Sequence, residues 1–214
     1  MADSRLPRTS QTGLHPRLDA VVRRHLETAW QQPLRGFSRT AFATLDEVAD
    51  AEIVLDAGCG TGYSTAMLAS RFPDCRVIGV DRSAARLARS PQMPPNAVLL
   101  RADLSDFWRL AKRAGWRLRR HYLLYPNPWP KALHLKRRWH AHPVWPDLIG
   151  LSGILELRTN FAVYADEFAR ALELTGHRAH LRVLSLPVEA AISPFEAKYA
   201  RSGHRLFCVS ADLG

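Results

Sequence analysis

The chain has 214 residues, of which 47% are hydrophobic and 23% charged, and this composition predicts a globular protein with a buried core. No apolar run is long enough to cross a bilayer, and no apolar segment follows the basic residues near the start, so we expect a cytoplasmic protein with no membrane partner. Thirty Lys and Arg against twenty Asp and Glu give a net charge of +10, which favours an acidic partner such as nucleic acid.

Three cysteines, Cys59, Cys75 and Cys208, are odd in number and lack the spacing of metal ligands. We expect them to be small buried residues, and we predict no metal site.

The chain divides by pattern into a basic arm with one helix, residues 1–45, and a main domain, residues 46–214. In the arm only residues 18–30 show helical spacing of apolar positions. Further on, short apolar runs predict strands at 53–56, 76–81, 97–103, 118–125, 154–159, 178–186 and 206–210. Helical patterns separate most of them, at 61–72, 83–89, 104–115, 144–151 and 160–176, and residues 193–196 are expected in a loop. This alternation predicts an α/β fold with a mostly parallel sheet.

A glycine-rich segment follows the first predicted strand, with Asp56 before Gly58, Gly60 and Gly62. Glycines at such a strand-to-helix turn let the backbone approach a nucleotide-like cofactor. Asp81 ends the second strand, where a carboxylate can accept hydrogen bonds from ribose hydroxyls. This pair resembles motif I and its acidic partner in class I S-adenosylmethionine methyltransferases, which implies that Asp103, after the third strand, contacts the adenine amine.

A second motif, Tyr125-Pro-Asn-Pro-Trp-Pro-Lys131, follows the fourth strand and resembles the proline-rich loop of enzymes that methylate base nitrogens. It lies within residues 107–146, which contain no Asp or Glu. Ten cations occur there, interleaved with aromatic and histidine side chains: Arg109, Lys112, Arg113, Arg117, Arg119, Arg120, Lys131, Lys136, Arg137 and Arg138. A solvated surface usually mixes its charges, so this segment predicts a track for a phosphate backbone.

Three segments together resemble the late motifs of the tRNA (guanine-N7-)-methyltransferase family. They are PNPWPKALHLKRRW (126–139), LRTNFAVY (157–164) and SPFEAKYARSGHRLFCV (193–209). The resemblance implies a class I, Rossmann-like methyltransferase fold: seven mostly parallel strands, the last one antiparallel, with helices on both faces. It also implies S-adenosylmethionine as cofactor, tRNA as substrate and methyl transfer to guanine N7.

The resemblance assigns roles by position. Asn127 matches the catalytic position, Lys131 the substrate lysine and Asn160 the residue that reads guanine. The implied cofactor contacts are Asp56, Gly58, Gly60, Gly62, Asp81, Asp103 and Asn127. The implied substrate contacts are Lys131, His134, Lys136, Arg137, Arg138, Asn160, Tyr164, Ser193, Phe195 and Glu196, of which Tyr164 and Phe195 could stack on a base.

Two departures from the family concern the proposed site. The family has aspartate where this chain has Asn127 and Asn160, and Thr-Lys where it has Ser193 and Pro194. Guanine N7 already offers a lone pair, so methylation requires alignment and no general base. Two alternatives stay open: methylation of an exocyclic base amine or of another RNA, and a catalytically impaired homologue that binds S-adenosylmethionine or RNA. We expect a monomer or a weak homodimer.

Overall fold

The computed structural model describes residues 4–45 and 51–214, and the chain forms two compact units. The first unit contains the chain up to Gln31, Tyr125–Pro146 and Glu156–Asp212. The second contains Gln32–Leu124, Asp147–Leu155 and Leu213–Gly214. The predicted boundary at residue 46 lies outside the described residues, and the division into arm and main domain stays a prediction.

The strands form a seven-stranded sheet in the order β3-β2-β1-β4-β5-β7-β6. The strands are β1 (Ile53–Ala57), β2 (Arg76–Asp81), β3 (Ala97–Arg101), β4 (Leu118–Leu124), β5 (Ile154–Thr159), β6 (His180–Leu184) and β7 (Leu206–Asp212). β1 pairs in parallel with both β2 and β4, β2 pairs in parallel with β3, and β7 is antiparallel to β6. The predicted seven strands and the antiparallel last strand are therefore confirmed.

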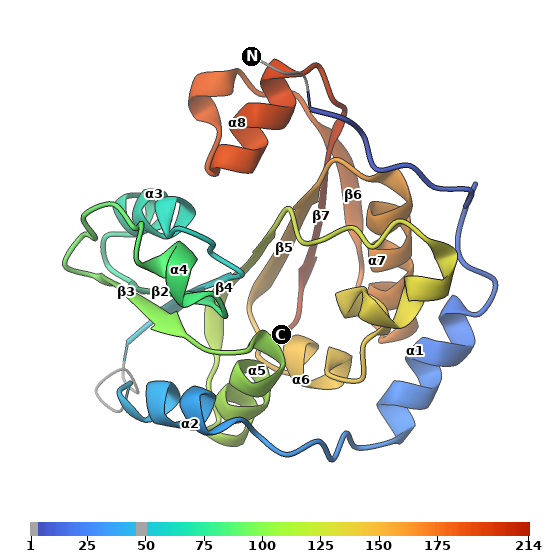
Figure 1. Ribbon diagram of the computed structural model, residues 1–214. Helices are drawn as coiled ribbons and strands as arrows, with labels where there is room; N and C mark the ends of the chain where they lie inside the picture. The colour runs from blue at the N-terminus through green and yellow to red at the C-terminus, as the bar shows by residue number, and fades with distance from the viewer. Residues whose placement is uncertain (1–3, 46–50) are drawn as a thin grey trace. The chain divides into compact units, whose positions relative to one another are not determined.

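Helices α1 and α2 precede the first strand, and the later α-helices lie between successive strands along the chain, as the colours of Figure 1 show. The α-helices are α1 (Leu18–Glu27), α2 (Gly36–Ala43), α3 (Tyr63–Arg71), α4 (Ala84–Leu87), α5 (Leu104–Arg113), α6 (Trp145–Ile149), α7 (Ala162–Leu174) and α8 (Pro194–Arg201). Three short 3-10 helices are η2 (Ala132–Arg137), η3 (Trp139–Ala141) and η4 (Val188–Ala190).

The second unit is built on a buried parallel sheet. All five residues of β1 are buried, which fits the apolar run at positions 53–55 with which the strand begins. Helix α3 contacts β1, β2 and β3, and α2 contacts α5 and β3. Phe42 of α2 packs against the rings of Phe107 and Trp116. Asp56 lies near the carboxyl end of β1, and Asp81 is the last residue of β2. Because the two strands are parallel, both acids lie at the same edge of the sheet.

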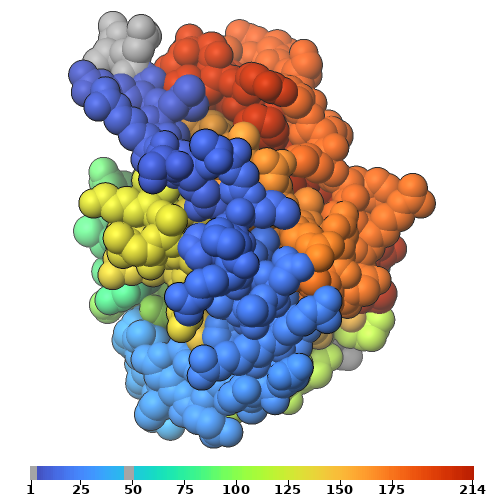
Figure 2. All heavy atoms as spheres, turned by 90° about the vertical axis from the view of Figure 1, so that its right-hand side faces the viewer, coloured from blue at the N-terminus to red at the C-terminus, as the bar shows by residue number. Residues whose placement is uncertain are grey.

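The first unit brings the start of the chain onto residues from its second half. Helix α7 contacts β6 and β7, and α1 contacts α7. Arg170 of α7 pairs with Asp19 of α1 at 2.5 Å. Figure 2 shows the N-terminal segment, in blue, lying over the yellow residues near 130 and the orange α7, in agreement with hydrogen bonds from Thr9 to Pro130 and from Gln11 to Glu167.

Two helices depart from the predictions. Residues 193–196 were expected in a loop, but Ser193 caps α8 by accepting a hydrogen bond from the Glu196 N–H at 3.1 Å. Pro194 occupies the first turn, a position that proline favours. α2 was not predicted, and it is anchored through Ser38, whose hydroxyl donates to the buried Asp106 at 3.0 Å. That partner is distant in sequence, so local pattern alone did not indicate the helix.

All three cysteines are free and buried, as predicted. No helix among the described residues is long and apolar enough to cross a membrane.

Candidate active site

The glycine-rich turn after β1 has a backbone that requires glycine. Gly58, Gly60 and Gly62 have φ values of 85°, 63° and 78°, a region that other residues rarely adopt. A β-carbon on Gly62 would lie 2.7 Å from Leu99 Cδ1. The Gly58 N–H donates to the Val80 carbonyl at 2.8 Å, and the Gly60 N–H donates to Asp81 Oδ2 at 3.0 Å. The turn is thus fixed against β2.

Asp56 is a buried acid with one free oxygen. Its Oδ2 accepts hydrogen bonds from Ser64 at 2.6 Å and Thr65 at 2.7 Å. Its Oδ1 is buried and has no hydrogen-bond partner in the part of the chain that the structure describes. Burial raises the pKa of Asp56 to about 6, although the two hydroxyls act in the opposite direction. A buried unpaired carboxylate oxygen is costly, so this position suits a cationic or donor group of a ligand.

Sequence reasoning did not single out Ser64, Thr65 and Gly79, which support Asp56. A β-carbon on Gly79 would lie 2.3 Å from Thr65 Oγ1, the atom that donates to Asp56. A glycine within a strand commonly marks a close approach of this kind, and that signal could have identified the contact.

Asp81 and Asp103 are both fixed by local partners. Asp81 Oδ1 accepts from the Ser83 N–H at 2.7 Å and pairs with Arg86 at 3.0 Å. A carboxylate has about four acceptor positions, so Asp81 retains capacity for a ribose hydroxyl. Asp103 caps α5, accepting from the Ser105 N–H at 3.1 Å. The predicted cofactor residues other than Asn127 therefore gather at one strand edge of the second unit, and their contact with a cofactor stays a prediction.

The proline-rich loop of the first unit contains two residues with left-handed backbone. Tyr125 has φ 52° and Trp129 has φ 43°, conformations that cluster at functional sites. The Tyr125 hydroxyl donates to the buried Glu196 at 2.9 Å, and its N–H donates to the Arg158 carbonyl at 2.8 Å. Between these two residues Asn127 is exposed, with its Oδ1 accepting from the Trp129 N–H at 3.3 Å.

Exposed cations follow this loop. Lys131, Lys136 and Arg137 are exposed, and the Arg137 guanidinium lies 4.7 Å from the centre of the Trp129 ring. The His134 ring packs edge-on against the same indole at 5.5 Å. Desolvation, followed by the charges of Arg137 and Lys131, lowers the pKa of His134. The lowered pKa favours the neutral form of His134, which offers a hydrogen-bonding group and no charge.

Arg138 departs from its predicted role as a phosphate contact. It is fully buried and ion-paired with Glu167, which is also fully buried. Arg138 Nη2 donates to the Trp129 carbonyl at 3.1 Å and to Gln11 at 3.2 Å. His140 lies 2.9 Å from Glu167, and we call Gln11, Arg138, His140 and Glu167 the Glu167 cluster. A buried guanidinium requires an internal partner, so this cation fixes the loop from inside.

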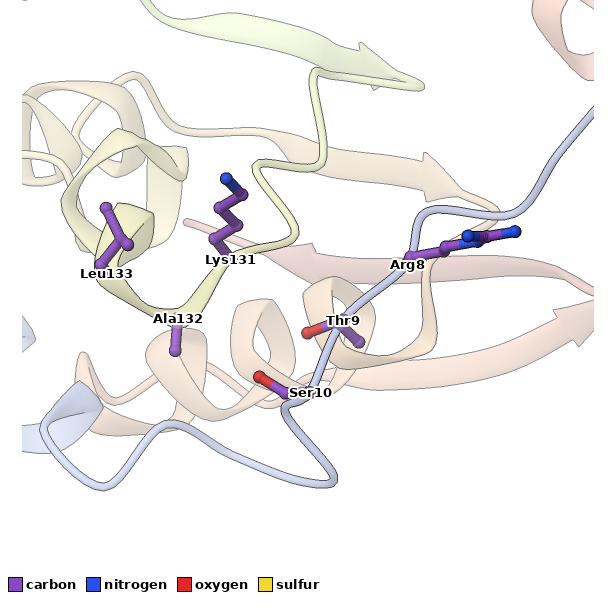
Figure 3. A pocket seen from close by; sticks show the side chains of 6 residues that line it. All are labelled: Arg8, Thr9, Ser10, Lys131, Ala132 and Leu133. Carbon is purple, nitrogen blue, oxygen red and sulfur yellow. The ribbon is translucent and has the colours of Figure 1, made fainter.

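The N-terminal arm completes the surface around Lys131. The Thr9 hydroxyl donates to the Pro130 carbonyl at 2.7 Å. A cavity of about 530 Å³ lies beside this contact, lined by Arg8, Thr9, Ser10, Lys131, Ala132 and Leu133. Figure 3 shows Lys131 extending from the loop, and Arg8 extending from the arm in another direction. The cavity lining therefore combines two cations and two hydroxyls without an acid.

Three further predicted substrate residues have internal contacts. Tyr164 is fully buried, and its hydroxyl accepts from the Trp139 N–H at 3.1 Å, so it cannot stack on a base in this structure. Glu196 is also fully buried and accepts from Arg158 at 3.0 Å. Ser193 caps α8, as described above. In contrast, the Phe195 side chain is 52% exposed and remains available to a base.

Asn160 lies at the end of β5 in a chain of hydrogen bonds that sequence reasoning did not foresee. Its Nδ2 lies 3.0 Å from His204 Nδ1, and His204 Nε2 lies 2.8 Å from the Ser4 carbonyl. The His204 ring stacks on Tyr199 at 5.3 Å, and Tyr199 stacks on Phe195 at 6.1 Å. The only sequence signal was that His204 lies in the third family-like segment.

A family model of methyltransferases, Methyltransf_4, matches residues 50–209 of the chain. The chain belongs to this family. It is an S-adenosylmethionine-dependent methyltransferase, and the free Asp56 oxygen, the left-handed glycines and Asp81 fit that cofactor, which carries an ammonium group and a ribose diol.

Named relatives are similar over different shares of the chain. A tRNA (guanine-N(7)-)-methyltransferase from Brevibacillus brevis is 26% identical over 172 residues, covering 74% of this chain and 79% of the relative. One from Mycobacterium avium is 35% identical over 132 residues, covering 56% and 49%. The solved 16S rRNA (adenine(1408)-N(1))-methyltransferase from Catenulisporales acidiphilia has a TM-score of 0.54 at 16% identity, covering 84% and 93%. This last similarity concerns the fold alone.

Proposed function

We propose that this methyltransferase transfers a methyl group to the N7 atom of a guanine in tRNA. The observation that carries the proposal is the loop after β4, which exposes Asn127 beside Lys131, Lys136 and Arg137 with no acid in the segment. The names of the relatives from Brevibacillus brevis and Mycobacterium avium support the same substrate.

The chemistry makes few demands on the protein. S-adenosylmethionine, when bound, supplies a methyl group on a positively charged sulfur. Guanine N7 carries an in-plane lone pair, so no side chain has to remove a proton before transfer. Asn127 is assigned the positioning of the base, because its amide is exposed and its loop is braced through Tyr125 and Arg138. An amide oxygen can also interact favourably with the cationic methylated ring, although more weakly than a carboxylate.

The exposed cations are assigned to the RNA backbone. Phosphate contacts are independent of sequence and supply much of the affinity of a protein for nucleic acid. Lys131, Lys136 and Arg137 are solvent-accessible, whereas Arg138 is enclosed in the Glu167 cluster. We therefore assign the backbone contacts of this segment to the first three, and the orientation of the loop to Arg138.

Mass spectrometry tests the proposal. Unmodified tRNA transcripts are incubated with the protein and labelled S-adenosylmethionine, digested to nucleosides and analysed for the labelled species. We expect 7-methylguanosine. Label on the exocyclic amine of adenosine or cytidine would overturn the proposal and favour the alternative acceptor. If S-adenosylmethionine and tRNA both bind but no nucleoside is labelled, the protein is a binding homologue instead.

A further inference from the structure

We infer that His204 orients the Asn160 side chain so that its amide oxygen is presented to the substrate base, with the N-terminal arm setting the direction. This inference rests on the proposed function, because it names the group that reads the guanine. It concerns the first unit, which contains Ser4, Asn160 and His204.

The direction follows from the Ser4 carbonyl. A carbonyl oxygen only accepts hydrogen bonds, so the contact of 2.8 Å from His204 Nε2 to Ser4 requires a proton on Nε2. In a neutral imidazole the other nitrogen is then an acceptor. His204 Nδ1 therefore accepts from the Asn160 amide NH₂ group, 3.0 Å away.

This arrangement determines what Asn160 presents. With Nδ2 bonded to His204, Asn160 Oδ1 has no hydrogen-bond partner within residues 4–45 and 51–214, and it is not among the buried atoms. The residue as a whole is only 8% exposed, and Oδ1 is one of its atoms that are not fully buried. A fixed acceptor of this kind matches the N1–H and N2–H₂ donors on the Watson–Crick edge of guanine. Adenine presents an acceptor at N1, and the site would leave it unpaired.

The contact with His204 gives a physical reason for asparagine at position 160, where the family has aspartate. A carboxylate there would place an acceptor against His204 Nδ1, which accepts when the proton is on Nε2. An amide satisfies both sides, since it donates to His204 and accepts from the base. The stacked rings of Phe195, Tyr199 and His204 limit how far the imidazole can turn. His204 is thus a positioning residue, and Asn160 is the residue that would touch the base.

An NMR experiment on the full-length protein tests the orientation without any reaction. A scalar coupling across the hydrogen bond is expected between Asn160 Nδ2 and His204 Nδ1. The protein contains a built-in reference, because the Trp108 indole N–H donates to His121 Nε2 at 3.1 Å in the buried core of the second unit. Coupling at the Trp108–His121 pair together with none at the Asn160–His204 pair would overturn the inference.

Kinetic assays test whether the orientation of the Asn160 amide selects guanine over adenine. In His204→Gln the glutamine can donate to Ser4 and accept from Asn160, so we expect the ratio of guanine to adenine labelling to stay within about threefold of wild type. In His204→Ala the amide is free to rotate, and the ratio should fall by about tenfold. His180→Ala, which removes an exposed histidine from β6, is the matched control and should have no effect.

The outcomes separate the two proposals. Equal losses in His204→Gln and His204→Ala, with both variants folded, would overturn the positioning role while leaving 7-methylguanosine as the product. Absence of labelled guanine with wild type would overturn the proposed function and the base-reading role with it. In that case the NMR coupling would still decide whether His204 orients the amide.

Discussion

Asp56 and Asn127 of the candidate site lie in local arrangements that cost stability in the free protein and that can favour the binding of a ligand. Asp56 has a buried oxygen without a partner, and burial raises its pKa to about 6. Asn127 is exposed on a loop whose neighbouring residues have left-handed backbone. Both features lower the stability of the free protein, as is common where a ligand is to be bound.

Asp56→Asn should stabilise the free protein at pH 8 but not at pH 4.5. The folded-state pKa of about 6 lies above the ordinary value of 3.8, so the folded state binds the proton more tightly. Protonated Asp56 therefore stabilises the folded state fully below about pH 4, and this stabilisation is lost as the pH rises through 6. Removing the charge should restore up to about 3 kcal/mol at pH 8.

Urea denaturation of both proteins at the two pH values measures this difference. Asp74→Asn, at an exposed acid, is the control. An equal effect of Asp56→Asn at both pH values would contradict the prediction. Calorimetry should also show weaker binding of S-adenosylmethionine to Asp56→Asn at pH 8. The amide has no negative charge, and with its oxygen accepting from Ser64 and Thr65 it presents NH₂ in place of the free oxygen.

Asn127→Asp should preserve or raise methyl transfer to guanine. A carboxylate can still accept from the Trp129 N–H, and it adds a negative charge near the cationic product. Asn127→Ala loses both the turn and the alignment and should be slower by about a hundredfold. Single-turnover assays with labelled cofactor measure both variants. A slower Asn127→Asp together with an unaffected Asn127→Ala would rule out the positioning role.

At the scale of elements, the Glu167 cluster joins three segments that are distant in sequence. Gln11 comes from the arm, Arg138 and His140 follow the proline-rich loop, and Glu167 lies in α7. Burial opposes the charge of Glu167, but hydrogen bonds from His140 and Arg138 outweigh burial and lower its pKa to about 2. The cluster therefore keeps a carboxylate ionised in the protein interior, paired with a guanidinium that is always charged.

Glu167→Gln should destabilise the protein strongly, by about 3–5 kcal/mol, because it leaves the buried Arg138 without a counter-charge. The double variant Glu167→Gln with Arg138→Met should recover part of that loss, since no unpaired charge remains. Thermal unfolding measures both, and an equal or larger loss in the double variant would argue against charge pairing. Asp166→Asn, the exposed neighbour in the same helix, is the control.

At the scale of the whole molecule, the net charge of +10 is accompanied by a segment with no acid from 107 to 146. The cations of this segment differ in their exposure to solvent. Arg109 and Arg138 are buried, and the Arg109 guanidinium donates to the Gln32 carbonyl at 2.6 Å. Lys131, Lys136 and Arg137 are exposed and can reach a phosphate.

Replacing Lys136 and Arg137 together with Ala should weaken tRNA binding and flatten its salt dependence. The slope of log affinity against log salt should decrease by roughly 0.7–0.9 for each lost phosphate contact. Binding of S-adenosylmethionine should be unchanged. Filter-binding titrations at several salt concentrations measure the slope. Arg71→Ala with Arg178→Ala removes the same charge at two exposed positions outside the segment. An equal slope change in this control pair would indicate only a general charge effect.

The sequence alone determined the succession of the seven strands along the chain, most of the helices other than α2 and α8, and the positions of the two main motifs. All of these depend on local signals: apolar runs and helical spacing mark the elements, and glycine and proline mark the turns. For this reason the sequence was sufficient to predict the glycine-rich turn, the strands β1 to β7 and the loop after β4. The match of the family model over residues 50–209 agrees with that part of the sequence.

Only the tertiary structure decided which charged and polar side chains are available. Arg137 and Arg138 are adjacent in a basic run, yet one is exposed and the other is enclosed by Glu167, 29 positions away in the chain. The contact between His204 and Ser4 spans 200 positions. Burial and hydrogen-bond partners depend on such long-range contacts, which local patterns do not encode. For this reason the orientation that we propose for the Asn160 amide depends on His204 and Ser4, its neighbours in space, whereas its place in the candidate site was predicted from the sequence.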